Sequence, residues 1–180
     1  DRTYHNRYIS EIEYEPTASS PRWLEFLQES CPLYIDFLQE WSGYVLMEGN
    51  PWEKLIWLFG PPGTGKSTFI KVLTELLGPM SRAINLEKMN DYTVASLDLP
   101  PLDQSEGMFR RLSLIPFETL PTNSDGLLFD KIRESELPGV LNWAIEGLKR
   151  LKTFDSAKAW EPPLNPNGEN IAAEYRRISE

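Results

Sequence analysis

The segment Gly60–Ser67 constrains the fold of this chain more than any other feature. Its sequence, Gly-Pro-Pro-Gly-Thr-Gly-Lys-Ser, matches the phosphate-binding pattern G-x-x-x-x-G-K-[ST] at every fixed position. A short apolar run at 54–59 precedes the segment, and an amphipathic run at 67–77 follows it and ends at Gly78-Pro79. A buried parallel strand, a glycine-rich loop and a helix in this order predict an α/β fold.

This loop predicts a site for a nucleoside triphosphate, with ATP and Mg²⁺ as the expected ligands. Its glycines let backbone N–H groups surround phosphate, and the helix that follows adds its positive N-terminal end. Lys66 is expected to contact the β- and γ-phosphates, Ser67 to bind the magnesium ion, and Thr68 to support the start of the helix. The predicted binding residues are Gly60, Pro61, Pro62, Gly63, Thr64, Gly65, Lys66, Ser67 and Thr68.

Composition and charge narrow the classes of partner. The net charge of −9 argues against a broad basic face of the kind that coats duplex DNA, although ring-shaped motors grip DNA with a few basic loops inside a channel. No apolar run approaches the length of a membrane-spanning helix, and we expect a cytoplasmic protein that does not enter a membrane. The single cysteine, Cys31, and the single histidine, His5, predict neither an internal disulfide nor a metal site.

Hydrophobic periodicity predicts three segments: a helical region at 1–50, a nucleotide-binding core at 51–151 and a tail at 152–180. In the first, amphipathic runs at 22–29 and 33–47 predict two helices packed on one another, with Trp23 and Trp41 as core residues rather than base-stacking platforms. The remaining predicted elements are a weak strand at 92–97, a strand at 112–117, helices at 126–134 and 137–151, and a terminal helix at 169–180.

Several strings around the loop resemble known proteins. The sequence Pro61-Pro62-Gly63-Thr64 resembles the loop sequence common in AAA+ ATPases. Other segments resemble the superfamily 3 primase-helicases of phages, plasmids and viruses. These strings are Arg-Trp-Leu at 22–24, Phe-Leu-Gln-Glu-Trp-Ser-Gly-Tyr at 37–44, Leu-Pro-Pro-Leu-Asp at 99–103, Gly-Met-Phe-Arg-Arg-Leu-Ser-Leu-Ile-Pro-Phe at 107–117 and Glu-Leu-Pro-Gly-Val-Leu-Asn-Trp-Ala at 136–144. They occur in the family's order and span most of the chain.

The resemblance implies an AAA+ P-loop NTPase whose parallel sheet is flanked by helices and preceded by a small helical region. It also implies a hexameric ring that hydrolyses ATP to unwind DNA during replication of a virus, phage or plasmid in the host cytoplasm. Such a module is the C-terminal part of a larger polypeptide that carries a primase or polymerase domain. Single-stranded and duplex DNA are the implied partners.

The resemblance also implies a catalytic arginine. In the family, an arginine of the Arg-Arg-Leu string reaches the active site of the neighbouring subunit, and its position corresponds to Arg111, with Arg110 as the second candidate. A guanidinium supplied in this way neutralises charge that develops on the γ-phosphate. The alternative is an arginine that forms an ion pair at the start of a strand.

One part of the family pattern is missing. Only 45 residues separate Gly65 from Arg111, which leaves too little chain for the expected acidic Walker B strand, the sensor strand and a DNA-gripping hairpin. Asp98 is the nearest candidate for a Walker B carboxylate, but the Leu-Pro-Pro that follows it favours a loop. We therefore expect residues to be absent from this sequence near Leu97 and Asp98. A continuous chain would instead favour a site that binds nucleotide without hydrolysing it.

Two other classes of function compete with the helicase. The first is a nucleotide-dependent assembly or scaffold protein, which the missing Walker B carboxylates favour. The second is a P-loop kinase for a small molecule, although the sequence has no arginine-rich lid motif. Recovery of the Walker B carboxylates in a longer sequence would remove most of the support for the assembly protein. Phosphate release stimulated by single-stranded DNA, without a phosphorylated metabolite, would distinguish the helicase from the kinase.

Overall fold

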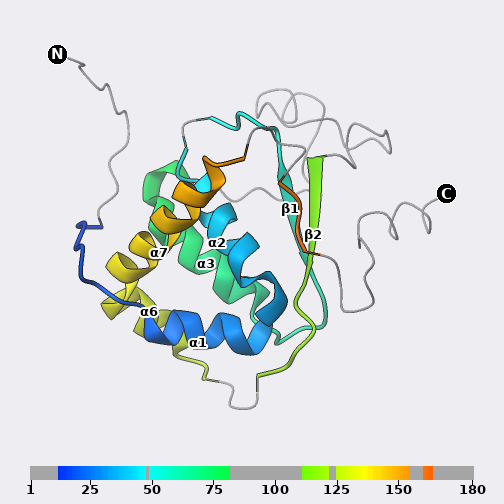
Figure 1. Cartoon of the computed structure of the whole chain (residues 1–180). Helices are drawn as coiled ribbons and strands as arrows, with labels where there is room; N and C mark the ends of the chain where they lie inside the picture. Colours follow the sequence, from blue (N-terminus) through cyan, green and yellow to red (C-terminus); the bar gives the residue numbers. More distant parts are fainter. Residues whose placement is uncertain (1–11, 48, 82–110, 122–124, 155–159, 164–180) are drawn as a thin grey trace.

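The computed structural model describes residues 12–47, 49–81, 111–121, 125–154 and 160–163. In sequence order, the elements are α1 (Pro21–Ser30), a 3₁₀ turn (Pro32–Tyr34), α2 (Ile35–Tyr44), β1 (Leu55–Phe59), α3 (Lys66–Leu77), a second 3₁₀ turn (Gly78–Met80), β2 (Leu112–Pro116), α6 (Leu128–Ser135) and α7 (Leu137–Leu151). Helices and a parallel strand pair form an α/β fold, with the helices gathered on one side of the strands (Figure 1).

Strands β1 and β2 pair in parallel, from Leu55 opposite Leu112 to Phe59 opposite Pro116. The pairing continues one step beyond β2, where the Phe117 N–H donates to the Phe59 carbonyl at 2.8 Å. A β-carbon at Gly60 would overlap the Phe117 carbonyl, so only glycine allows this close approach at the start of the loop.

The prediction of a buried strand at 54–59 is correct for the strand and wrong for its burial. Most of β1 is half-buried, and the Trp57 side chain is 53% exposed. Among the residues that the structure describes, β1 has β2 as its only strand neighbour, which leaves its other edge without a described cover. The residues of β2 are almost all buried.

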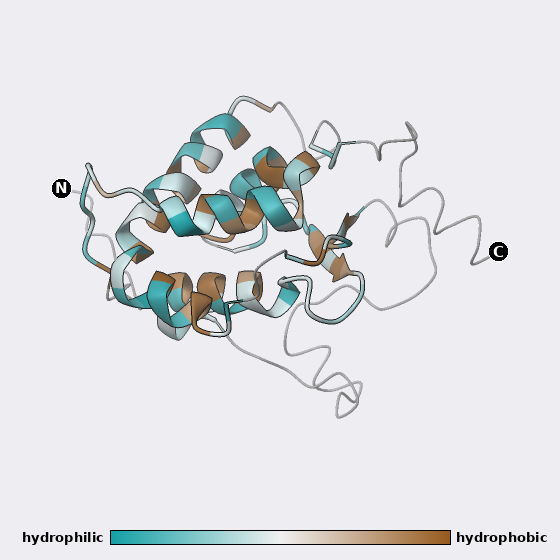
Figure 2. Ribbon diagram, turned by 90° about the horizontal axis from the view of Figure 1, so that it is seen from below, coloured by the Kyte–Doolittle hydropathy of each residue, from teal (hydrophilic) through white to brown (hydrophobic). Residues whose placement is uncertain are grey.

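The predicted helices at 22–29, 67–77, 126–134 and 137–151 are confirmed to within one or two residues. Apolar and polar residues are interleaved along these helices, as their amphipathic patterns require (Figure 2). Trp23 and Trp41 are buried in the core, which confirms their predicted role. Cys31 is also buried, and this burial raises the pKa of its thiol to about 12, so that it stays protonated at neutral pH.

The packing of the first two helices differs from the prediction. Helix α2 packs most extensively on α7, while α1 lies against α6 and the 3₁₀ turn that follows it. The cause is a pair of glycines at the α2–α7 crossing: Gly43 faces the backbone of α7 at Leu148, and Gly147 faces the backbone of α2 at Gln39. Without side chains at these two positions, the helix axes approach more closely than two ordinary helices do.

Substituting Gly147 with alanine is expected to destabilise the protein by about 2 kcal/mol, because the added methyl group would overlap the Gln39 carbonyl of α2. This net figure includes the gain of roughly 1 kcal/mol in helix propensity from glycine to alanine. Chemical denaturation followed by circular dichroism would measure the loss. Gly126→Ala is the matched control, because that position has open space and should change stability by less than about 0.5 kcal/mol. Equal stability of the two variants would contradict the close crossing.

Polar contacts reinforce the same crossing. Arg150 of α7 donates to the Glu40 carboxylate at 3.1 Å and to the Gln39 side-chain oxygen at 2.6 Å, both on α2. The second Glu40 oxygen accepts from the indole N–H of Trp160 at 2.9 Å. Trp160 stacks on Phe37 and Trp41, so the tail that follows α7 returns to the N-terminal helical region.

A buried carboxylate joins α1 to α7. Glu136, which is almost fully buried, accepts hydrogen bonds from the backbone N–H groups of Arg22 and Trp23 at the start of α1. The Arg22 guanidinium contacts the same carboxylate at 3.0 Å and also donates to Ser135 at the end of α6. The first turn of α1 is therefore capped by a residue more than 100 positions away in the sequence.

Several predicted features lie outside the described residues. They are His5, the strand at 92–97, the candidate residues Asp98 and Arg110, the suggested break near Leu97 and Asp98, and the helix at 169–180. Among the described helices, even the longest, α7 with 15 residues, does not reach the length and apolar character of a membrane span.

Candidate functional site

The glycine loop has a backbone that only glycines adopt readily. Gly60, Gly63 and Gly65 have φ angles of 131°, 84° and 96°, all in the region that side chains disfavour. Gly65 occupies the N-cap position of α3, and Lys66 is the first helical residue. The loop therefore passes directly into the amino end of a 12-residue helix, where unpaired N–H groups favour an anion.

Lys66 lies across its own loop. Its ammonium group donates to the Gly60 carbonyl at 2.8 Å, to the Pro61 carbonyl at 2.6 Å and to the Thr64 hydroxyl at 3.2 Å. The Thr64 hydroxyl in turn donates to the Pro61 carbonyl at 2.9 Å. These neutral acceptors hold the positive charge at the mouth of the loop, and charged phosphate oxygens would be stronger partners for the same donor.

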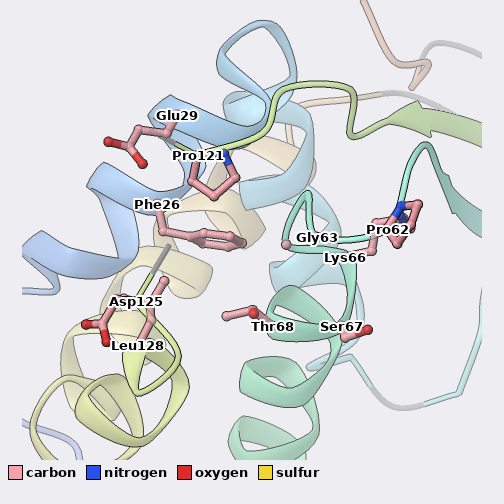
Figure 3. Close-up of a pocket in the computed structure, with 11 residues that line it drawn as sticks. Phe26, Glu29, Pro62, Gly63, Lys66, Ser67, Thr68, Pro121, Asp125 and Leu128 are labelled. Carbon is pink, nitrogen blue, oxygen red and sulfur yellow. The ribbon is translucent and has the colours of Figure 1, made fainter. Parts of the chain in front are cut away.

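A cavity of about 450 Å³ opens beside the loop. Among the predicted binding residues, Pro62, Gly63, Gly65, Lys66, Ser67 and Thr68 line it (Figure 3). The other three do not line it: Gly60 lies against Phe117, Pro61 accepts hydrogen bonds from within the loop, and the Thr64 side chain is buried. The volume is in the range of ordinary small-molecule sites.

The opposite wall of the cavity comes from residues that sequence reasoning did not assign to the site. Helix α1 supplies Phe26 and Glu29, and the segment from the end of β2 to the start of α6 supplies Pro121, Asp125 and Leu128. Figure 3 shows Lys66 and Pro62 on one side of the cavity, with Glu29, Asp125 and Leu128 on the other. The sequence placed Phe26 in the amphipathic run at 22–29 and contained no signal that placed this helix beside the loop.

Phe26 connects this wall to the loop itself. Gly65 has no side chain, which lets the edge of the Phe26 ring lie directly against the loop backbone. The ring packs on Trp23, which stacks on Phe69 in the first turn of α3, and Phe69 packs on Phe117 after β2. A continuous set of buried aromatic rings therefore supports the loop on the side that faces α1.

Asp125 is held in place by two donors. One of its oxygens accepts the Leu127 N–H at 2.9 Å, and the other contacts the Lys131 ammonium at 2.7 Å. The hydrogen bond from Lys131, and to a smaller extent that from the Leu127 N–H, lowers the pKa of the Asp125 carboxyl below its usual value. The carboxyl group is therefore ionised at neutral pH. Asp125 and Lys131 therefore form a fixed ion pair at the wall opposite Lys66.

The residues at the start of α3 also fit a magnesium nucleotide. Ser67 presents an exposed hydroxyl on the cavity wall, an oxygen ligand suited to a magnesium ion that takes its other ligands from phosphates and water. Thr68 follows Ser67 on the helix and points toward the α1 side of the cavity (Figure 3). Within the described parts of the chain, no group of three or more His, Cys, Asp or Glu side chains has the geometry of a protein-only metal site.

Arg111 lies at the other end of the strand pair. It immediately precedes β2 and forms an ion pair with Glu53, two residues before β1. Because β1 and β2 are parallel, this pair lies at their amino ends, whereas the loop leaves β1 at its carboxyl end. Five strand residues span about 16 Å, so the structure does not bring Arg111 together with the loop of its own chain.

Comparison with known proteins supports the class of protein to which this site belongs. Residues 53–113, about one third of the chain, match the model of the family described as magnesium chelatase, subunit ChlI. The matched segment contains β1, the glycine loop and α3. Because that family is an AAA+ family, the match supports an AAA+ nucleotide-binding ATPase with an α/β fold. It gives no support to superfamily 3 helicases in particular, and no curated protein matches the chain.

Proposed function

We propose that this chain is the ATP-binding and ATP-hydrolysing module of an AAA+ ring motor that acts on DNA. The observation that carries the nucleotide part is the cavity in which Gly63, Gly65 and Lys66 meet the amino end of α3. This combination of positive-φ glycines, a lysine and helix N–H groups suits the phosphates of a nucleotide. The family match over residues 53–113, which contain this loop, also supports the nucleotide part.

Each residue of the loop has a proposed task. The backbone N–H groups around Gly63 and Gly65 bind the β-phosphate, and Lys66 exchanges its loop carbonyls for β- and γ-phosphate oxygens. The Ser67 hydroxyl binds Mg²⁺, which neutralises charge on the phosphates when it is bound. The loop residues include no Asp, Glu or His side chain that could act as the general base. The loop therefore binds and orients the nucleotide, and the group that activates water comes from elsewhere.

The DNA-unwinding part of the proposal rests on the sequence strings that resemble superfamily 3 helicases. Members of AAA+ families commonly assemble into rings, and we propose a homo-hexamer for this chain. In that ring, Arg111 of one subunit contacts the γ-phosphate bound by its neighbour. The position of Arg111 far from its own loop supports a role between subunits rather than within one.

ATP turnover in the presence of DNA tests this proposal. Purified protein should release inorganic phosphate from ATP with Mg²⁺, and single-stranded DNA should raise the rate, because the turnover of a motor is coupled to movement along its track. A forked duplex carrying a fluorophore and a quencher would report strand separation. ATP binding without DNA-stimulated release would favour the assembly protein, and a phosphorylated small molecule as product would favour the kinase.

A further inference from the structure

The cavity beside the glycine loop is polarised along its length. At one end, Lys66 and the amino end of α3 present positive charge and N–H donors. At the other end, the wall from α1 and α6 presents apolar surface from Phe26, Pro121 and Leu128, with the carboxylates of Glu29 and Asp125 at its rim. The two ends suit a ligand with a polyanionic head and an uncharged, partly apolar tail.

We propose that the wall formed by α1 and α6 is the nucleoside subsite of this protein, with the base seated against Phe26 and Leu128. Hydroxyl or amino groups of the nucleoside donate to the rim carboxylates. This inference rests on the proposed binding of ATP at the loop and extends it to residues from outside the loop.

Charge determines the direction in which the ligand lies. The exposed Glu29 carboxylate would repel the phosphates of a nucleotide if these lay beside α1, and the loop offers the phosphates a lysine and helix N–H groups instead. Carboxylates are acceptors only, so at the rim they suit the hydroxyl and amino donors of a nucleoside. Asp125 is already oriented by Lys131 and the Leu127 N–H, which keeps its carboxylate at the rim without a ligand.

The subsite is built before a ligand arrives. Glu136 ties the start of α1 to the start of α7, and Arg22 extends the same contact to Ser135 at the end of α6. Phe26 is pressed against Gly65, so the apolar wall and the phosphate loop share one rigid boundary. A preformed wall adds affinity because little conformational freedom is lost on binding.

The test compares two ligands and two neighbouring leucines. Leu128 is half-buried and lines the cavity, whereas Leu127 is 61% exposed and does not. Leu128→Ala is expected to weaken binding of Mg-ATP about tenfold, through loss of apolar contact with the base. Binding of inorganic tripolyphosphate, which has no nucleoside, should stay within about twofold, and Leu127→Ala should leave both affinities unchanged within the same twofold. Isothermal titration calorimetry measures the affinity of each of the two variants for each of the two ligands.

A second variant covers the case in which Leu128→Ala unfolds. Glu29 lines the cavity near the end of α1, while Glu25, which is also exposed, lies one turn earlier on the same helix and does not line the cavity. Glu29→Gln is expected to weaken Mg-ATP binding about fivefold, with tripolyphosphate binding unchanged or tighter, and Glu25→Gln should change neither.

The outcomes separate this inference from the function on which it rests. Unchanged ATP affinity in both Leu128→Ala and Glu29→Gln would overturn the subsite. Equal weakening of ATP and tripolyphosphate in a folded variant would also overturn it, because the wall would then serve the phosphates. If the unmodified protein binds neither ligand, the proposed ATP function itself fails, and that result is visible without any variant.

Discussion

Lys66→Ala is expected to lower the affinity for Mg-ATP at least 100-fold, which corresponds to about 3 kcal/mol for the loss of charged contacts to phosphate. Among the described residues that line the cavity, Lys66 carries the only ammonium group, so no other lining side chain of this part of the chain replaces its charge. Its present partners are two loop carbonyls and a hydroxyl, all uncharged acceptors that a triphosphate readily displaces. Titration with a fluorescent ATP analogue measures the loss.

Lys71→Ala is the matched control for this variant. Lys71 lies on the same helix, is exposed and sits over the ring of Phe129 rather than in the cavity. Its removal should change ATP affinity by less than about twofold. If Lys66→Ala bound ATP as tightly as Lys71→Ala, the loop would not be the nucleotide site. Thermal unfolding of both variants verifies that the helix has survived.

Arg111→Ala is expected to lower the ATP turnover of the assembled protein by about 10³-fold while leaving ATP affinity nearly unchanged, as for an arginine that stabilises the transition state from a neighbouring subunit. The structure gives Arg111 no access to the loop of its own chain, because the two lie at opposite ends of the parallel strands. Mixing the variant with Lys66→Ala subunits should restore part of the turnover, since each supplies what the other lacks.

Glu53→Gln distinguishes this role from a structural ion pair. It breaks the same pair as Arg111→Ala but keeps the guanidinium. The pair is partly exposed, so its loss should cost at most about 1 kcal/mol of stability in either variant. Turnover close to that of the unmodified protein in Glu53→Gln would support the role between subunits. Equal loss of turnover in the two variants would show that Arg111 acts only by holding Glu53 in place.

The local elements followed from sequence patterns because their causes are local. The apolar stripe of 137–151 and the stop at Gly78-Pro79 depend on neighbours within a few turns, and both helices lie where the patterns predicted. The burial of β1 was predicted wrongly because an apolar run shows that a strand is apolar and does not show what covers it. Trp57 is exposed in the described structure although its neighbours in the sequence are all apolar or aromatic.

Long-range packing was not accessible from the sequence. The runs at 22–29 and 33–47 read as partners because they are adjacent in the chain, but α2 packs mainly on α7. What decides this is the pair Gly43 and Gly147, each of which makes room for the backbone of the other helix. In the sequence, a glycine inside a helical pattern indicates only a lower helix propensity. That it lets another helix approach closely is visible only when the two helices are seen packed together.

The sequence by itself determined the phosphate end of the candidate site, since eight consecutive residues contain the glycines, lysine and serine that this chemistry needs. Only the tertiary structure decided the other end, because Phe26, Glu29, Asp125 and Leu128 come from two segments about 100 residues apart. The physical reason is that a phosphate is held by contiguous backbone N–H groups, whereas an apolar wall needs surface from separate helices. That surface exists here because Glu136 and Gly65 allow α1 to pack against both α7 and the loop.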